Sequence, residues 1–248
     1  MRKKYKNPPL IETLCEFYFA PEASQDFENI IHLLNEKIQT TFPKKSRLQF
    51  QASQINIDNA GAPILTEHLL PLVRFQSSTE RVLIQVGQNL LTINHLKPYT
   101  SWEEFLPSVE MGFNAYRDVV KPGAIHRIAL RYINRIEFAR NRIGLEDYFE
   151  LRPFMGQKLL QDISAFNLGI QTPREKARDA LNIQMASIDS GSPSMVAILL
   201  DLTYSLVKLE DITFDSVNEW LAVAHNHVED AFEACITNQL RELFEEVK

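Results

Sequence analysis

Three arginines recur at every fourth residue of the stretch 125–139, as Arg127, Arg131 and Arg135. Apolar and polar residues alternate along this stretch with a period of two, which is typical of a half-buried strand. Residues four apart then lie on the same face. Planar guanidinium groups bind phosphate and carboxylate groups in a bidentate manner. The pattern therefore indicates an arginine stripe that could bind an anion.

An alternative explanation comes from two acids, Glu12 and Glu16, in an earlier stretch of alternating residues. A shift of 115 residues along the sequence lays Glu12 on Arg127 and Glu16 on Arg131. If these two strands are neighbours, acids and arginines face each other as a structural ion-pair ladder. We favour the ladder over the anion site, because cross-strand pairs of opposite charge need no ligand. The candidate binding residues are Glu12, Glu16, Arg127, Arg131 and Arg135.

The histidines do not predict a metal site. On a helix, His225 and His227 would point about 200° apart, so they cannot converge on one ion. His225 and Glu229 have the spacing of neighbours on a helix, but two ligands are too few for a site. We interpret them as part of a solvated helix face. No metal ligands are therefore predicted.

Known catalytic and cofactor motifs are missing from the sequence. It contains no G-x-G-x-x-G, phosphate-binding loop, H-E-x-x-H, G-x-S-x-G or C-x-x-C pattern. We predict no cofactor, and no catalytic residues can be assigned. A non-enzymatic role is slightly favoured, although a site assembled from distant residues would leave no local motif.

The composition fits a soluble globular protein: 45% of the 248 residues are apolar and 23% are charged. A net charge of −6 disfavours nonspecific binding to nucleic acids. Cys15 and Cys235 lie far apart in apolar stretches, which predicts two buried, reduced thiols. The basic start is followed by Asn7-Pro8-Pro9 instead of an apolar segment, and no apolar run could span a membrane. We therefore expect a cytoplasmic protein without membrane contact.

The elements that would position the candidate residues follow one order twice. In the first half we expect a strand, a helix, several strands and a helix, at 10–20, 24–42, 48–57, 69–76, 82–86, 90–96 and 101–120. In the second half we expect strands at 125–139, 166–171, 180–188 and 195–207, with helices at 145–151, 155–160 and 216–247.

Two capping-box patterns, Ser101-x-x-Glu104 and Ser216-x-x-Glu219, coincide under the same 115-residue shift. We infer a duplicated β-α-β(3–4)-α unit, with one half at 1–122 and the other at 123–248. The predicted fold is α+β, with an extended, curved antiparallel sheet backed by helices as one continuous structural unit. This arrangement resembles the helix-grip or TATA-binding-protein-like folds in its elements only, without any of their sequence motifs.

The last expected helix, 216–247, has an apolar stripe with 4-3-4-3 spacing from Val217 to Cys235. Such spacing could pair two helices in a homodimer. Packing of the helix on its own sheet explains the same residues and is the interpretation we prefer.

Several of these stretches together resemble an uncharacterised, sporadically distributed prokaryotic family of about this chain length. The resemblance depends on Asn7-Pro8-Pro9-Leu10-Ile11-Glu12 at the start, Tyr99 with Ser101-Trp102-Glu103, Leu130-Arg131-Tyr132-Ile133-Asn134-Arg135, and Phe232-Glu233 with Ile236-Thr237. It covers nearly the whole chain and implies a bacterial or archaeal protein. It implies no activity and supplies no functional residues.

We predict a binding or regulatory module that uses the open face of its sheet. Its ligand would be a protein partner or a small anionic molecule, because the candidate residues are charged and share one face. The alternative is an enzyme with a dispersed site that acts on nucleotides or nucleic acid, in a defence-associated or mobile-element setting.

Overall fold

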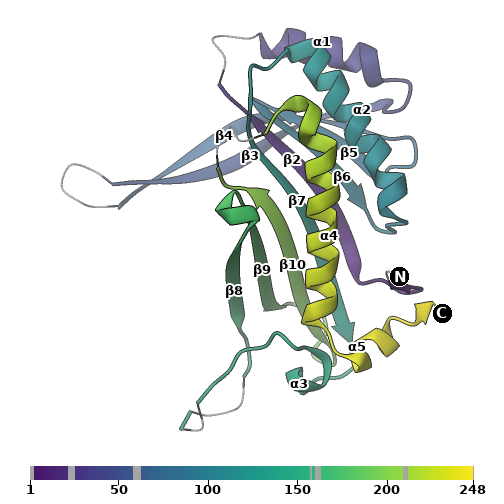
Figure 1. The fold of residues 1–248 in the computed structure, drawn as a ribbon, viewed down its shortest axis with the longest axis vertical. Helices are drawn as coiled ribbons and strands as arrows, with labels where there is room; N and C mark the ends of the chain where they lie inside the picture. The colour runs from purple at the N-terminus through teal and green to yellow at the C-terminus, as the bar shows by residue number, and fades with distance from the viewer. Residues whose placement is uncertain are drawn as a thin grey trace. The chain divides into compact units, whose positions relative to one another are not determined.

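The computed structural model describes residues 3–21, 26–57, 63–156, 158–159, 163–208 and 212–247, with only the backbone described at 50–57 and 63–70. The fold is α+β: nine strands form an antiparallel sheet in the order β3-β4-β5-β6-β2-β7-β10-β9-β8, and the described residues contain five α-helices (Figure 1). A second, two-stranded sheet pairs β1 with β11. The predicted α+β class with a large antiparallel sheet is confirmed.

The chain divides into two compact units, and the boundary passes through β2 and β7. Unit 1 contains residues 1–14, 96–99 and 127–248, and unit 2 contains residues 15–95 and 100–126. The elements up to α2 are β1 (Lys4–Tyr5), β2 (Leu10–Phe19), α1 (Phe27–Ile38), β3 (Lys44–Ile57), β4 (Pro63–Gln76), β5 (Val82–Gly87), β6 (Leu90–Leu96) and α2 (Trp102–Val120).

In unit 2, α2 packs closely on strands β5 and β6. Gly112 makes this approach feasible, because a Cβ at this position would lie 3.0 Å from the Ile93 side chain and 3.3 Å from Ile84. Phe113, the next residue, contacts Phe17 of β2 with ring centroids 4.7 Å apart. The apolar stripe of α2 therefore forms the core of unit 2 together with the buried residues of the strands.

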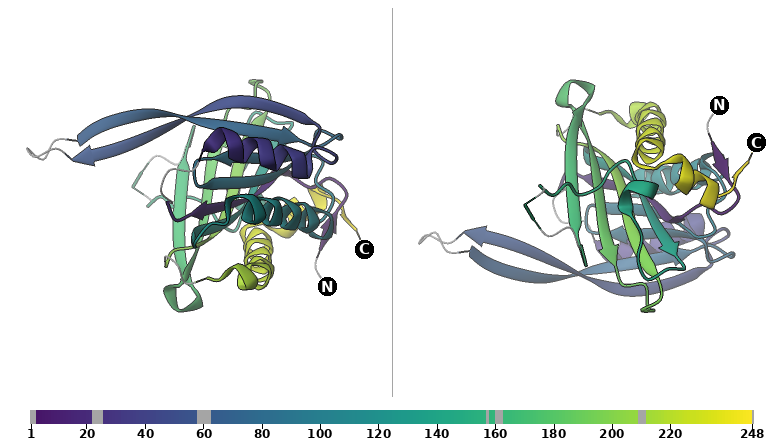
Figure 2. Two further views of the ribbon diagram at one scale, coloured as in Figure 1. Left: turned by 90° about the horizontal axis from the view of Figure 1, so that it is seen from above. Right: turned by 90° about the horizontal axis from the view of Figure 1, so that it is seen from below.

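In unit 1, strands β7, β10, β9 and β8 lie side by side, and helix α4 covers one face of the sheet (Figures 1 and 2). Tyr204 of β10 and Trp220 of α4 are both buried, with ring centroids 5.5 Å apart. The elements after α2 are β7 (Ile125–Phe138), α3 (Leu145–Tyr148), β8 (Asn167–Arg174), β9 (Asp179–Ile188), β10 (Val196–Leu206), α4 (Val217–Cys235), α5 (Asn238–Leu243) and β11 (Glu246–Val247).

The expected single helix 216–247 is wrong. Helix α4 ends at Cys235, and Ile236 is extended (φ −116°, ψ 148°) and forms an isolated β-bridge with Phe149. Thr237 then caps a separate helix, α5, by accepting a hydrogen bond from the Leu240 amide. A tertiary contact and a new N-cap therefore break a periodicity that is otherwise compatible with one helix.

The described residues of 155–160 are not helical, so the helix expected there is wrong. At the other expected helix, 145–151, α3 is a single turn. The first predicted capping box forms only in part. Ser101 accepts the Glu104 amide as predicted, but the Glu104 carboxylate accepts the Thr100 hydroxyl at 2.6 Å. The predicted box Ser216-x-x-Glu219 is wrong: the Ser216 side chain does not cap α4, and the box that forms pairs Thr213 with Ser216 at a 3₁₀ turn before α4.

The two ends of the described chain are held together by charge pairs. Lys3 contacts Glu246 at 2.8 Å and Lys6 contacts Glu245 at 3.2 Å, beside the β1–β11 pair. None of the described helices is long and apolar enough to cross a bilayer.

Both cysteines are free and buried, as expected. Burial raises the pKa of the Cys235 thiol to about 11 and raises the pKa of Cys15 as well. Both thiols are therefore protonated at neutral pH and weakly reactive.

A buried carboxylate, Asp179, ties the β8–β9 hairpin to the helical layer. Asp179 is fully buried, and its Oδ1 accepts the indole N–H of Trp220 at 3.1 Å. Its Oδ2 accepts the Tyr204 hydroxyl at 3.1 Å and pairs with Arg178 Nη2 at 2.7 Å. Burial, followed by the charge of Asp179, raises the pKa of Tyr204, so this phenol stays a donor. One carboxylate thus satisfies buried donors from β10 and α4.

We predict that Asp179→Ala lowers the free energy of unfolding by about 3–5 kcal/mol, because it leaves the Tyr204 and Trp220 donors buried without an acceptor. Urea denaturation followed by circular dichroism measures this loss. Asp215→Ala, at an exposed aspartate of unit 1, is the control and should change stability by less than about 0.5 kcal/mol. Equal effects of the two substitutions would contradict the anchoring role of Asp179.

Candidate binding face

Burial alternates along β7 from Leu130 to Phe138, as the sequence predicts, whereas Ile128, Ala129 and Leu130 are all buried. Arg127 is exposed and Arg131 and Arg135 are partly exposed, whereas the intervening residues of the other parity are buried. On that buried side, the Tyr132 hydroxyl lies 2.8 Å from Nδ1 of His225 in α4. The three arginines therefore share the face of the unit 1 sheet that is turned away from α4.

The strand register extends this face across all four strands of unit 1. Arg131 of β7 is directly opposite Thr203 of β10, Thr203 is opposite Asn182 of β9, and Asn182 is opposite Gln171 of β8. Because directly opposed residues share a face, these four side chains form one line, which we call the polar row. At the usual strand spacing, the polar row is about 14 Å long.

Three members of the polar row have no partner within the described part of the chain. Thr203 and Asn182 are partly exposed and Gln171 is exposed, and their side chains form no hydrogen bond to any described residue. Polar groups on the covered face behave differently: the Tyr132 hydroxyl and the Asp179 carboxylate are buried and hydrogen-bonded. The polar row therefore offers donors and acceptors that folding does not use.

The fourth member of the row, Arg131, is held by an aspartate that sequence analysis did not identify. Asp201 of β10 accepts hydrogen bonds from Arg131 Nε at 2.9 Å and 3.0 Å and from Nη2 at 2.5 Å. The Asp201 side chain is 5% exposed and that of Arg131 is 39% exposed. A bidentate contact of this kind fixes the plane of the guanidinium group.

A sequence signal for Asp201 did exist. It is the only charged residue of β10, and an acid in a largely apolar strand requires a partner when it is buried. The identity of that partner depends on strand order, which the sequence does not contain.

The other two arginines have different surroundings. Arg135 Nε contacts Glu137 at 2.7 Å, and its Nη2 donates to the Asp189 carbonyl at 3.2 Å. Arg127 is exposed. Arg131 and Arg135 thus each have a carboxylate beside them.

The two predicted acids lie on β2, the strand next to β7 in the sheet order. Glu12 belongs to unit 1 and Glu16 to unit 2, and both are partly exposed. The predicted ladder between these acids and the arginines stays a prediction. The ion pair of Arg131 with Asp201 is an interaction that the ladder hypothesis did not include.

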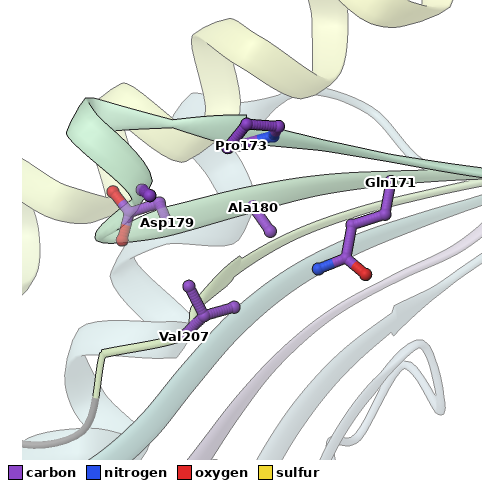
Figure 3. Close-up of a pocket in the computed structure, with 6 residues that line it drawn as sticks. Gln171, Pro173, Asp179, Ala180 and Val207 are labelled. Carbon is purple, nitrogen blue, oxygen red and sulfur yellow. The ribbon is translucent and has the colours of Figure 1, made fainter.

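A hollow of about 320 Å³ lies at the Gln171 end of the polar row. Figure 3 shows the Gln171, Ala180 and Val207 side chains on one side of the strands, with the Asp179 carboxylate pointing away from them. The lining residues are Gln171, Pro173, Ala177, Asp179, Ala180 and Val207. The hollow is thus bordered mainly by small apolar side chains and by one amide.

The turn that leads to this hollow has an unusual backbone. Glu175, Lys176 and Ala177 all have positive φ angles, of 45°, 55° and 65°. Left-handed conformations are uncommon for residues other than glycine, and strain of this kind is found at functional sites more often than elsewhere. Because Ala177 lines the hollow, the strained turn shapes its edge.

The interpretation of the histidines as part of a solvated helix face is wrong for His225, which is buried. Its Nε2 lies 3.3 Å from Glu229, so the expected contact one helical turn apart is present.

Burial, followed by the electrostatic interaction with Tyr99, raises the pKa of Tyr132. His227 stacks on Tyr204 with ring centroids 4.9 Å apart. The described residues include no cluster of three or more side chains suited to a metal ion.

Comparison with known proteins adds no relative: no family model matches the chain, and no curated protein matches it.

We predict that Arg131 and Asp201 are coupled by about 1–3 kcal/mol, because Asp201 is nearly buried and the contact is bidentate. A double-mutant cycle of Arg131→Ala and Asp201→Ala, measured by urea denaturation, gives this energy. The exposed pair Lys37–Asp118, 2.9 Å apart, is the control cycle and should give less than about 1 kcal/mol. A coupling near zero for Arg131 and Asp201 would contradict a structural role for their contact.

Proposed function

We propose that this protein is a binding module and that its ligand is a protein partner that lies along the polar row. The observation that carries the proposal is the line of Thr203, Asn182 and Gln171, whose side chains have no hydrogen-bond partner among the described residues. Flat surfaces with several uncommitted donors and acceptors are suited to a partner that supplies the complementary groups.

The hollow at the end of the row supports a protein partner over a small molecule. Pockets for small molecules enclose most of the ligand surface, whereas the polar row lies open along about 14 Å of sheet. Pro173, Ala177, Ala180 and Val207 offer an apolar recess into which one side chain of a partner would fit. Gln171 lines the hollow as well and would bond to the backbone beside that side chain.

A small anionic ligand is the second candidate, and the arginine stripe supports it. Asp201 holds the Arg131 guanidinium in one orientation, and Arg127 is exposed on the same face. The carboxylates beside Arg131 and Arg135 reduce the local positive charge, which weakens the attraction for an anion. We therefore place the anion second.

We also propose that the two halves of the chain arose by duplication and follow a helix-grip-like plan. Support comes from the strand order, in which β6-β2 and β10-β7 are matching pairs on either side of the centre. In each half the first strand is innermost, the last strand is next to it, and a long helix follows the last strand. The family resemblance of the sequence remains a separate hypothesis.

We predict that Asn182→Ala weakens capture of the partner at least tenfold, because a well-placed interface hydrogen bond contributes on the order of 1.4 kcal/mol. The measurement is quantitative capture from an extract of the native host with the immobilised protein, followed by titration of the identified partner. Asn226→Ala, which removes the same group from the exposed side of α4, is the matched control.

Three outcomes can be distinguished. Loss of capture with Asn182→Ala alone supports the polar row as the binding site. Equal capture by both variants contradicts it. In the third outcome, inorganic phosphate lowers partner binding, and Arg127→Ala abolishes partner binding whereas Asn182→Ala does not. This outcome would favour the anionic ligand.

A further inference from the structure

Strand β8 is the last strand of the sheet order, so one of its edges has no neighbour among the described strands. Its register with β9 shows which backbone groups lie on that edge. The Ser187 amide donates a hydrogen bond to the Phe166 carbonyl at 3.1 Å. Continuing the β8–β9 register by one residue beyond the Asn167–Ala186 pair places Phe166 opposite Ser187, so this is a hydrogen-bonded pair. Because hydrogen-bonded positions alternate in antiparallel pairs, even-numbered residues of β8 bond to β9.

The odd-numbered residues Asn167, Gly169 and Gln171 therefore direct their amide and carbonyl groups outward. Pro173 agrees with this assignment: it is also odd-numbered, and proline in a sheet is placed where no amide donor is needed. Pro173 also limits the stretch that can accept another strand to about residues 167–171.

The edge lacks the features that usually prevent strand pairing. Natural edge strands are protected by lysines, inward-pointing charges or bulges. Residues 167–172 of β8 carry no charge, and a Cβ added at Gly169 would have no atom within 4 Å. Of the usual protective residues, β8 has only Pro173 and Arg174, both at one end.

The sequence of this edge is complementary to itself. In an antiparallel pair of two β8 strands centred on Gly169, Leu168 is opposite Ile170 of the second copy and Asn167 is opposite Gln171. Apolar residues thus meet apolar residues on one face and amides meet amides on the other. No like charges face each other within the paired stretch, so the arrangement has no electrostatic penalty.

Exposed apolar residues add to this surface. Ile170 is 39% exposed, on the side of the sheet that α4 covers over β10. In the segment that precedes β8 in the sequence, Phe154, Leu159 and Ile163 are 93%, 62% and 38% exposed. A standard interface buries about 800 Å² per partner, and a pair of short strands needs such neighbouring apolar surface to reach it.

We propose that β8 pairs with β8 of a second copy of this chain, in an antiparallel two-fold arrangement centred on Gly169. The two unit 1 sheets then form one continuous sheet across the dimer. The contact is isologous and closes after two copies, because each chain uses its single β8 edge. Gln171 belongs to both surfaces, but the dimer proposal does not require that a partner binds the polar row, and its test uses this chain alone.

Gly169→Pro tests the proposal, because it removes an outward amide and leaves the even-numbered bonds to β9 in place. Sedimentation equilibrium of the wild type should show a mass that rises with concentration to twice the 28.6 kDa of the monomer. The variant should remain at the monomer mass. Leu243→Lys, at an exposed apolar residue of α5, is the control and should behave as the wild type.

A second variant protects the test against misfolding of the proline variant. Ile170→Lys places two lysines near the two-fold axis, and the charge repulsion should also give monomers. Circular dichroism and urea denaturation report whether each variant is folded.

Gly169→Cys should form a disulfide-linked dimer on mild oxidation, because the two Cα atoms at the axis would be about 5.5 Å apart. Asn226→Cys is the control, and the native cysteines are buried.

Two results would overturn the proposal. One is a wild type that stays monomeric into the millimolar range. The other is a dimer that persists in folded Gly169→Pro and Ile170→Lys and leaves Gly169→Cys without a crosslink. The second result would mean that the dimer interface lies on another surface. The next surface to test would be α4 and α5, which cover the helix predicted at 216–247.

Discussion

The antiparallel register of β7, β10, β9 and β8 is the constraint on which the functional argument depends. It decides which side chains share a face, and a shift by one residue would exchange the two faces. With the observed pairing, Tyr132 and Tyr204 lie beneath α4, and Arg131 and Asn182 lie on the opposite face. The same register directs Gly169 toward the free edge. The polar row and the proposed dimer contact are thus two consequences of one hydrogen-bond pattern.

The polar row and the covered face of the unit 1 sheet differ in whether their polar side chains form internal hydrogen bonds. On the covered face, the buried Asp179 carboxylate accepts hydrogen bonds from Tyr204 and Trp220. A buried donor without an acceptor costs free energy, so these hydrogen bonds serve stability. On the other face, Asn182 and Thr203 have no partner among the described residues, because water can satisfy them. The proposed partner would bond to these groups without breaking a hydrogen bond between described residues of the protein.

The end of the sheet near β8 brings together the features that folding alone does not explain. The strained turn at 175–177 and the uncharged edge at 167–172 belong to one hairpin, which also borders the hollow beside Gln171. Asp179 anchors this hairpin to α4, so its backbone can hold an unfavourable conformation. An anchored hairpin would lose less conformational entropy on binding the proposed partner or the proposed second copy.

The sequence by itself determined the α+β class, most of the strands and the shared face of Arg127, Arg131 and Arg135, because a period of two is a local property of the chain. It did not determine the break at Ile236, since this break depends on a bridge to the distant Phe149. Nor did it identify Asp201 as the partner of Arg131 or place His225 in the interior, because strand order and helix docking decide both. Local patterns are fixed by the geometry of one segment, whereas the polar row requires four strands in register. Only the tertiary structure therefore brings Arg131, Thr203, Asn182 and Gln171 into line.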